Sequence, residues 1–211
     1  MNFKKLTLGL YQTNCYILVS GTEAAVIDPG YEPDTILDAL EGLTLKAILL
    51  THGHFDHVGA VRELVAETGC EVWIHAAEST MPPMVTAGPL YFTRTYDEGD
   101  TISPISGVEL TVLHTPGHTP GSVCLLCGGD LFSGDTLFEG SCGRVDLPGG
   151  NGQQMVASLR RLAALQADYR VHPGHGDSTA LSAERRYNPY MRYYAGDFPC
   201  RDRPPGRSDR R

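Results

Sequence analysis

Thr51-His52-Gly53-His54-Phe55-Asp56-His57 is the stretch of sequence that decides how this chain folds. It follows an apolar run at 47–50, Ala-Ile-Leu-Leu, which predicts a buried strand. After it, apolar residues recur at helical spacing over 58–65, which predicts a helix. The polar residues therefore occupy a short loop at the carboxyl end of a strand, the place where open α/β sheets usually hold their functional sites.

The side chains of this loop predict a metal site. Three histidines and one aspartate stand within it, at positions 52, 54, 57 and 56. Imidazole nitrogen and carboxylate oxygen suit zinc, iron or manganese. A single histidine beside a strand is commonly a structural residue. Three histidines in one tight loop repel one another when charged, and a bound cation gives them a reason to be there.

Length and composition indicate an ordinary globular protein without a nucleic-acid or membrane partner. The chain has 211 residues, enough for one large domain or at most two small ones, and a formal net charge of −8. That negative charge disfavours a surface that binds the phosphate backbone of a nucleic acid. No apolar stretch approaches the ~20 residues needed to cross a bilayer. Lys4 and Lys5 precede an apolar run, but polar residues at 12–14 interrupt it and no cleavage site follows, so we predict a cytoplasmic protein.

The cysteines show no disulfide framework. Six of them are scattered along the chain, at positions 15, 70, 124, 127, 142 and 200. Cys124 and Cys127 have the spacing of half a zinc site, but they fall in a predicted strand at 122–128. Residues three apart in a strand point to opposite faces, and no second pair exists. We therefore interpret them as buried strand residues.

The order of predicted elements indicates an α/β fold. The expected strands lie within 6–20 (with a turn at Thr13-Asn14) and at 24–28, 45–50, 71–75, 100–102, 108–113, 123–127, 131–132 and 169–171. The expected helices lie at 33–41, from the metal loop to Thr68, at 154–165 and, as the last one, at 179–187. Residues 79–96 are expected to form a surface loop beside the site. We predict one domain over 1–200 and a disordered tail at 201–211.

Three later loops supply further candidate ligands. The motif His114-Thr-Pro-Gly-His118-Thr-Pro-Gly follows one predicted strand. Ser133-Gly-Asp135-Thr and His172-Pro-Gly-His175-Gly follow two others. Each loop places a histidine or aspartate in a turn marked by glycine or proline, where the backbone can approach a metal closely.

Taken together, the motifs T-H-x-H-x-D-H, P-G-H-T-P-G, S-G-D-x-L-F and P-G-H-G occur in an order and spacing that resemble the metallo-β-lactamase superfamily. The chain looks most like its hydroxyacylglutathione hydrolase (glyoxalase II) branch, in the short form without a C-terminal domain. The resemblance covers residues 5–190. It implies an α/β fold of four layers, an αββα sandwich in which helices flank two mixed β-sheets.

The resemblance also implies a ligand set for two divalent metal ions, zinc before iron or manganese. One ion would take His52, His54 and His118, and the other Asp56, His57 and His175, with Asp135 bridging them. Asp56 and Asp135 would be the catalytic residues. Asp28 matches an aspartate that holds a ligand loop in place in this fold, although a plain turn-forming Asp-Pro explains it equally well. The remaining histidines have no counterpart among the ligands and are expected to be structural; they are His75, His114 and His172.

The expected chemistry is hydrolysis of a thioester. Two metal ions lower the pKa of a shared water, so that a metal-bound hydroxide can attack a carbonyl. We find no Ser–His–Asp relay and no cysteine in a basic setting. A thiol leaves as a thiolate without a dedicated acid, whereas an amine must be protonated. The resemblance indicates a small-molecule thioester, S-2-hydroxyacylglutathione such as S-lactoylglutathione.

Arg144 is the candidate substrate-binding residue. The stretch 141–144, Ser-Cys-Gly-Arg, resembles a loop that holds the glutathione carboxylate in longer relatives, and an arginine fork suits a carboxylate. The alternative is a solvated loop charge.

A persulfide dioxygenase is the rival function. Those enzymes share this fold and bind one iron at positions matching His52, His118 and Asp135, with a C-G-R-x-D loop like 142–146. The Leu137-Phe138 pattern and the Pro-Gly-Gly at 148–150 favour the hydrolase. β-Lactamase activity is disfavoured, because those enzymes commonly have a cysteine ligand in place of Asp135.

Overall fold

The first of two large sheets combines antiparallel and parallel strands in the order β1-β2-β3-β4-β5-β6. Its first three strands pair antiparallel and the remaining ones parallel. The strands are β1 Asn2–Leu8, β2 Thr13–Ser20, β3 Glu23–Ile27, β4 Thr44–Leu49, β5 Glu71–His75 and β6 Arg94–Tyr96. The helices between them are α1 Pro33–Ala39, α2 Phe55–Val58, α3 Val61–Thr68, the 3₁₀ helix η1 Ala76–Thr80 and α4 Pro83–Thr86.

The second sheet has the order β14-β13-β10-β9-β8-β7 and is also mixed, since only β10 and β13 run parallel. Its strands are β7 Thr101–Ile105, β8 Val108–His114, β9 Val123–Cys127, β10 Asp130–Gly134, β13 Arg170–Pro173 and β14 Thr179–Ala180. A small hairpin pairs β11 Leu137–Phe138 with β12 Ser141–Cys142. The later helices are α5 Gly152–Ala163, α6 Leu181–Tyr187 and α7 Pro189–Ala195.

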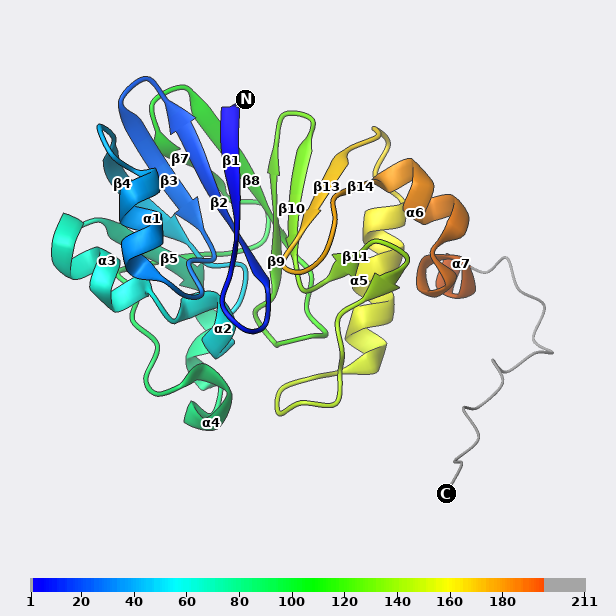
Figure 1. Cartoon of the computed structure of the whole chain (residues 1–211). Coiled ribbons are helices and arrows are strands. Elements are labelled where there is room, and N and C mark those ends of the chain that lie inside the picture. Colours follow the sequence, from blue (N-terminus) through cyan, green and yellow to red (C-terminus); the bar gives the residue numbers. More distant parts are fainter. Residues whose placement is uncertain (1, 196–211) are drawn as a thin grey trace.

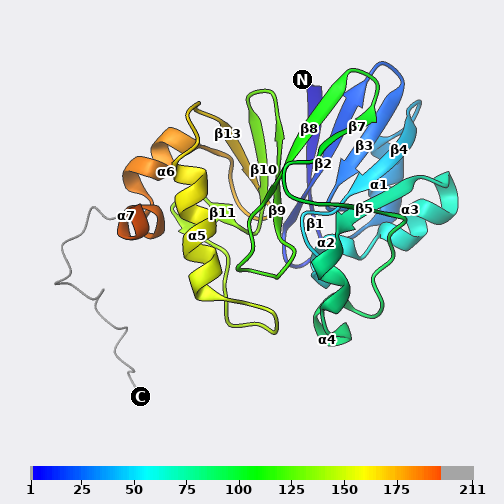
Figure 2. The ribbon, with the colours of Figure 1, turned by 180° about the vertical axis from the view of Figure 1, so that it is seen from behind.

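In this computed structural model, which describes residues 2–195, the two sheets lie face to face between two layers of helices (Figure 1). The predicted αββα sandwich with two mixed sheets is therefore confirmed. Figure 2 shows α5 covering the outer side of the second sheet. Within the described residues no helix is long and apolar enough to cross a membrane. The predicted domain end at 200 and the tail at 201–211 lie outside them.

Alternation along the strands builds three cores. On β2, Cys15 and Ile17 face the helices α1 and α3, while Tyr16 and Leu18 face the second sheet. Cys127 belongs to the core between the sheets, whereas Cys124 packs with the core under α5. This confirms that the two cysteines point to opposite faces. Each fully buried aliphatic side chain contributes about 1.5–3 kcal/mol to the sandwich.

The predicted turn at Thr13-Asn14 is wrong, and the reason concerns the site. The turn lies at 9–12, and β2 begins at Thr13. Asn14 Nδ2 donates to the carbonyls of Pro173 and Gly176, both at 2.9 Å, and its backbone N donates to Gly174 O at 2.7 Å. These polar residues hold the loop after β13, a long-range role that local turn chemistry does not reveal.

Other predicted elements differ at their ends. The helix after the metal loop is broken into α2 and α3, because Ala60 N donates to Pro29 O at 3.0 Å instead of to the preceding helical turn. Gly59 packs so closely on Gly30 that a Cβ there would lie 2.2 Å from Gly30 O. Residues 79–96 contain α4 and β6 in addition to loop. The helix at 179–187 starts with a short strand, and it is followed by α7.

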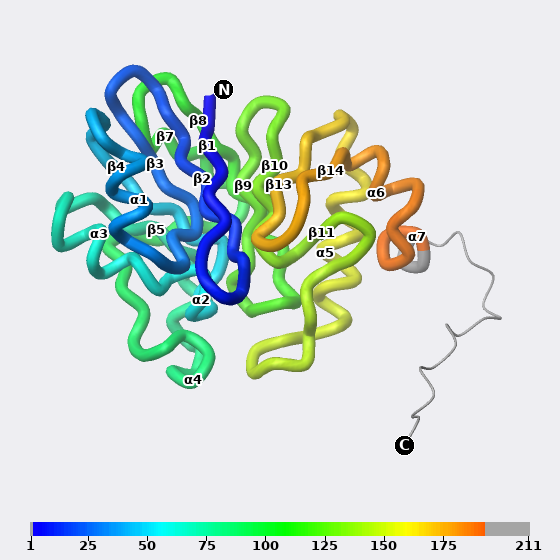
Figure 3. The backbone as a smooth tube through the Cα atoms, viewed as in Figure 1, coloured from blue at the N-terminus to red at the C-terminus, as the bar shows by residue number. Residues whose placement is uncertain are grey.

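The fold brings the ends of β4, β8, β10 and β13 to one edge of the sandwich. Val123 N, at the start of β9, donates to Thr51 O at 2.9 Å, and Gly174 N donates to Gly134 O at 2.9 Å. A Cβ at Gly134 would lie 2.4 Å from the Thr51 hydroxyl oxygen, so this glycine, with φ +49°, permits the close approach. Figure 3 shows that the turn between β1 and β2 lies beside α2 at the same edge.

Candidate metal centre

The first group of candidate ligands joins loops from the two sheets. His52 and His54 follow β4, and His118 follows β8. All three are buried, and their ligand atoms lie close enough together to hold a metal ion. His54 Nδ1 lies 2.8 Å from His118 Nε2, so the two rings present nitrogens to the same point.

The second group consists of Asp56 and His57 on α2 and His175 after β13. His175 Nε2 lies 3.3 Å from Asp56 Oδ2 and 3.3 Å from His57 Nε2. Thr13 Oγ1 donates to Asp56 Oδ2 at 3.3 Å. These three residues too could hold one ion.

Asp135, which follows β10, lies between the two groups. Its Oδ1 is 3.4 Å from His57 Nε2, and its Oδ2 is 3.5 Å from both His118 Nε2 and His175 Nε2. The structure thus gathers every sequence-predicted ligand in one cluster: His52, His54, Asp56, His57, His118, Asp135 and His175.

Unpaired polar atoms in the buried cluster indicate that it can hold a cation. His52 Nε2, His54 Nε2 and Asp135 Oδ1 are buried without a hydrogen-bond partner. A buried polar atom left unpaired costs about 1–3 kcal/mol, so the unpaired His52 Nε2 and Asp135 Oδ1 call for a cationic partner. The unpaired Nε2 of His54 is on the other side of its ring from the Nδ1 that faces His118. Nitrogen and carboxylate donors suit a divalent ion of the zinc or iron type. The histidine and aspartate cluster therefore suits a dinuclear metal site.

Burial and neighbouring charges set the protonation of the ligands. Burial, followed by the surrounding histidines, holds the pKa of His52 well below its usual value, and the same causes lower the pKa of His54 to about 4. Both rings are neutral at pH 7, as a metal ligand must be. Burial opposes the charge on His57, but Asp135, Asp28 and Asp56 outweigh it and raise its pKa to about 9. A metal ion must displace that proton.

Asp28 orients His57. Its Oδ1 accepts from Thr51 N at 2.7 Å, while its Oδ2 accepts from Thr51 Oγ1 at 2.6 Å and pairs with His57 Nδ1 at 2.9 Å. The carboxylate fixes the proton on Nδ1 and leaves Nε2 toward the cluster. Of the two readings of Asp28, the structure supports the one in which it holds the ligand loop. Asp28 also lies near enough to His52 and His57 to form a third possible group, but its oxygens already accept these bonds.

A hollow of about 670 Å³ opens beside the cluster. His54, Asp56, His118, Asp135 and His175 form its base. Its walls are mostly apolar and come from Tyr11, Phe55, Met84, Val85, Phe138, Leu147 and Pro148. Met84 and Val85 belong to the segment at 79–96, so that segment does flank the site. The hollow suits a small molecule whose reactive group reaches the cluster and whose apolar part lies on these walls.

Arg144 lines the hollow, but its guanidinium is engaged. Its Nε and Nη2 donate to Asp146 Oδ1 and Oδ2 at 2.7 and 2.8 Å, and both side chains are exposed. The backbone of Arg144 has a role that sequence reasoning misses. His118 Nδ1 lies 2.8 Å from Arg144 O, which directs His118 Nε2 toward the cluster.

The histidines predicted to be structural have partners away from the cluster. His172 bonds Asp130 Oδ1 at 2.8 Å and Ser178 Oγ at 3.0 Å. His75 and His114 stack at 4.2 Å between ring centres. Buried Glu78 also escapes sequence reasoning, because one glutamate in a region expected to be loop carries no motif.

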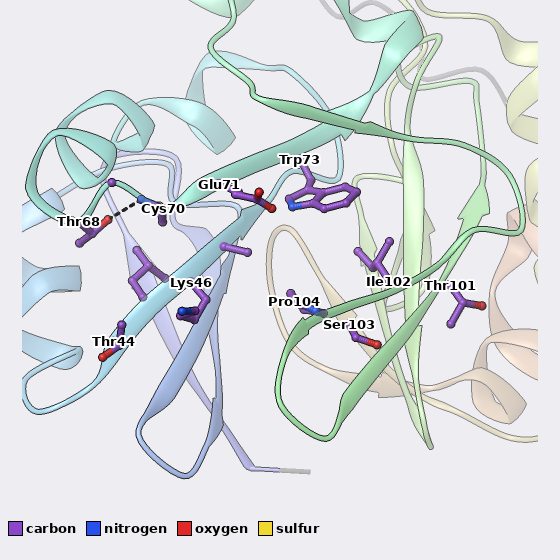
Figure 4. A pocket seen from close by; sticks show the side chains of 13 residues that line it. Thr44, Lys46, Thr68, Cys70, Glu71, Trp73, Thr101, Ile102, Ser103 and Pro104 are labelled. Atoms are coloured by element: carbon purple, nitrogen blue, oxygen red, sulfur yellow. Dashed lines mark hydrogen bonds between the residues drawn. The ribbon is translucent and has the colours of Figure 1, made fainter.

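A second hollow, of about 580 Å³, lies at the opposite edge of the sheet (Figure 4). It is lined by the start of β4 and the start of β5, including Thr44, Lys46 and Glu71. Parallel strands present their carboxyl ends at one edge, so this hollow faces away from the metal cluster. It contains none of the candidate ligands.

Comparison with known proteins identifies the class. Residues 8–175 match the metallo-beta-lactamase superfamily, so the chain belongs to that superfamily. Hydroxyacylglutathione hydrolase GloC of Haemophilus influenzae is 33% identical over 211 residues, covering 90% of this chain and 98% of GloC. The chain is thus a member of a metallo-hydrolase superfamily with hydroxyacylglutathione hydrolases among its relatives.

Solved structures extend the comparison. BLEG-1 B3 metallo-beta-lactamase aligns with a TM-score of 0.81 and 36% identity, over 90% of this chain and 99% of that one. TTHA1623 in a di-iron-bound form gives 0.78 and 40%, over 89% and 99%. ETHE1 from Myxococcus xanthus gives 0.79 and 30%, over 90% and 84%. All three structures have the fold of this chain, but their names do not indicate one shared activity.

Proposed function

We propose that this protein uses two divalent metal ions to hydrolyse a thioester, S-2-hydroxyacylglutathione such as S-lactoylglutathione. The observation that carries the proposal is the carboxylate of Asp135 lying between two groups of three candidate ligands. His52, His54 and His118 would hold the first ion, and Asp56, His57 and His175 the second. Zinc is the ion we propose, with iron as the alternative that the di-iron form of TTHA1623 supports.

The chain's own residues prepare the ligands. A bound pair of divalent ions lowers the pKa of a water and polarises a carbonyl. Four ligand rings have their Nδ1 at an oxygen: His52 at Thr51 Oγ1 (3.1 Å), His57 at Asp28 (2.9 Å), His118 at Arg144 O (2.8 Å) and His175 at Tyr11 O (3.0 Å). Each Nε2 is thereby aimed at the centre, where it can bind an ion once it carries no proton.

The surroundings of the cluster favour a thioester. Apolar walls exclude water and hold an acyl group near the ligands. Apart from the proposed ligands, none of the residues among 2–195 that line the hollow carries a carboxyl or imidazole group to protonate a leaving group. A thiolate leaves without that help. Arg144 would exchange the carboxylate of Asp146 for a carboxylate of glutathione. This exchange costs little free energy, because the Arg144–Asp146 ion pair is exposed to solvent.

A thioesterase assay with a matched histidine pair tests the proposal. Wild type is expected to cleave S-lactoylglutathione with kcat/KM of at least ~10⁴ M⁻¹s⁻¹, equally well without oxygen. His175→Ala should lose one bound ion and most turnover. His172→Ala, which changes a histidine on β13 that is bonded to Asp130 and Ser178, should keep both ions. Absence of thioester cleavage by fully metal-loaded wild type would refute the proposal.

A mononuclear iron persulfide dioxygenase is the second candidate. The 30% identity to ETHE1 and the Cys-Gly-Arg-Val-Asp loop at 142–146 favour it. It predicts oxygen uptake matched to loss of glutathione persulfide, a halt under anaerobic conditions, and comparative tolerance of His175→Ala. Oxygen uptake of this kind without thioester cleavage would replace the first proposal by the second.

A further inference from the structure

One buried carboxylate joins the two loops of the first ligand group. Glu78 is fully buried. Its Oε2 accepts from Gly53 N at 2.6 Å, and its Oε1 accepts from Gly121 N at 2.7 Å. Gly53 stands between His52 and His54, and Gly121 closes the loop that carries His118. The same side chain therefore grips a loop from each sheet.

The two glycines allow that grip. A Cβ at Gly53 would lie 2.9 Å from Glu78 Oε2, and one at Gly121 would lie 2.8 Å from both Oε1 and Cγ of Glu78. Contacts this short do not occur for real side chains, so a larger residue at either position would push the carboxylate away. Both backbone N–H groups can reach the carboxylate because neither residue has a side chain.

The sheet delivers Glu78 to this position. β5 runs parallel to β4, so η1 at its end emerges beside the loop that follows β4. His75, the last residue of β5, caps η1 by accepting from Ala77 N at 3.2 Å, while its ring stacks on His114 at the end of β8. Glu78 is thus held between the two strands whose loops it joins.

We propose that Glu78 is a positioning residue that sets the separation between His54 and His118, and so the affinity of the first metal site. The bond from Val123 N to Thr51 O joins the two loops at their bases. Glu78 is the link closest to the ligands, at Gly53 itself. Both of its oxygens point at backbone N–H groups, so it acts on the metal through the loops and not as a ligand. This inference rests on the proposed two-ion site.

The matched experiment compares Glu78→Gln with Glu184→Gln. An amide keeps one acceptor and turns an NH₂ toward the other N–H, so E78Q releases one loop. Glu184 is the control because it is also buried and accepts two hydrogen bonds, from Gly140 N at 2.9 Å and from Thr179 Oγ1 at 2.8 Å. Neither of these partners belongs to the two loops that Glu78 joins. Zinc affinity is measured in the full chain by competition with a chelator series, beside thermal unfolding.

E78Q is expected to weaken zinc binding at one site by about 10–100-fold, the usual cost of losing a residue that holds metal ligands in place without binding the metal itself. E184Q should leave both sites within about threefold. In a His54→Ala background, which removes the first site, E78Q should have no further effect; in His175→Ala it should keep its full effect. Equal losses in E78Q and E184Q, or an effect that persists with His54→Ala, would overturn the inference.

Two outcomes keep this test separate from the proposed function. Wild type that binds fewer than two zinc ions contradicts the two-ion proposal. Wild type that binds two, with E78Q unchanged, contradicts only the role of Glu78. If E78Q does not fold, Gly121→Ala disturbs the same contact while keeping the carboxylate, and unchanged zinc affinity in that variant overturns the inference.

Discussion

Replacing Asp28 by asparagine is expected to damage the second metal site and the stability of the metal-free protein together. The substitution isolates the charge, because Asp28 has φ +52° and asparagine tolerates this left-handed conformation. The side chain is buried and takes part in three hydrogen bonds of 2.6–2.9 Å with Thr51 and His57. Asparagine retains one oxygen acceptor and places an NH₂ where the other oxygen stood.

The structure sets the size of the effect. Hydrogen bonds to a charged group contribute about 1.5–3 kcal/mol each, and losing up to two of them, with partial relaxation, gives a destabilisation of about 2–4 kcal/mol. If the new NH₂ instead donates to His57 Nδ1, the ring must carry its proton on Nε2, the atom that faces the cluster. Both outcomes should lower zinc affinity at the second site by about 10–100-fold.

Urea unfolding in the presence of a chelator measures the stability, and competition with a chelator series measures zinc affinity. Asp146→Asn is the control, because its ion pair with Arg144 is exposed and should contribute no more than about 1 kcal/mol. If D28N remained within about 0.5 kcal/mol of wild type with both zinc affinities unchanged, the orienting role of Asp28 would be wrong.

Three further predictions follow from the site. The pKa of His57 is raised to about 9 from 6.5, so its stabilisation is complete below pH 6.5 and is lost as pH rises through 9; urea unfolding of metal-free protein should show this fall in stability. Arg144→Ala should raise KM for S-lactoylglutathione several-fold with little change in kcat, and Asp146→Asn should lower KM by freeing the guanidinium; steady-state kinetics with both variants tests this. Benzylpenicillin should be cleaved at least about 100-fold less efficiently than the thioester, because its leaving amine must be protonated whereas a thiolate leaves unaided; the ultraviolet absorbance of each substrate measures both rates.

The α/β class and the loops that carry candidate ligands can be predicted from local signals, whereas the four layers and the grouping of the ligands are what the family resemblance implies. The continuous apolar run at 15–19 is typical of a strand buried on both faces, and the four motifs each stand directly after a strand. The strands that carry the motifs end at one edge of the two sheets, so His57 and His175 meet, Nε2 to Nε2 at 3.3 Å, although 118 positions separate them. The structure confirms the sandwich and gathers all the predicted ligands into one cluster.

What sequence misses depends on partners far along the chain. Thr13 and Asn14 resemble a turn, yet Asn14 bonds carbonyls near position 175. Arg144 resembles an available cation, but Asp146 occupies it. Glu78 has no motif at all, since its importance lies in two backbone N–H groups brought to it by different sheets. No local pattern encodes such pairings.

The positions of Asp28 and Glu78 explain how a loop with little regular structure can present four ligands. Residues 51–57 contain only the start of α2, so the helix itself fixes only Asp56 and His57. Asp28, at the end of β3, holds the loop at Thr51 and His57. Glu78, after β5, holds it at Gly53. Because β3 and β5 flank β4 in the sheet, the two carboxylates grip the loop from both sides. Each removes a different freedom of the backbone, which is why their variants should affect different metal ions.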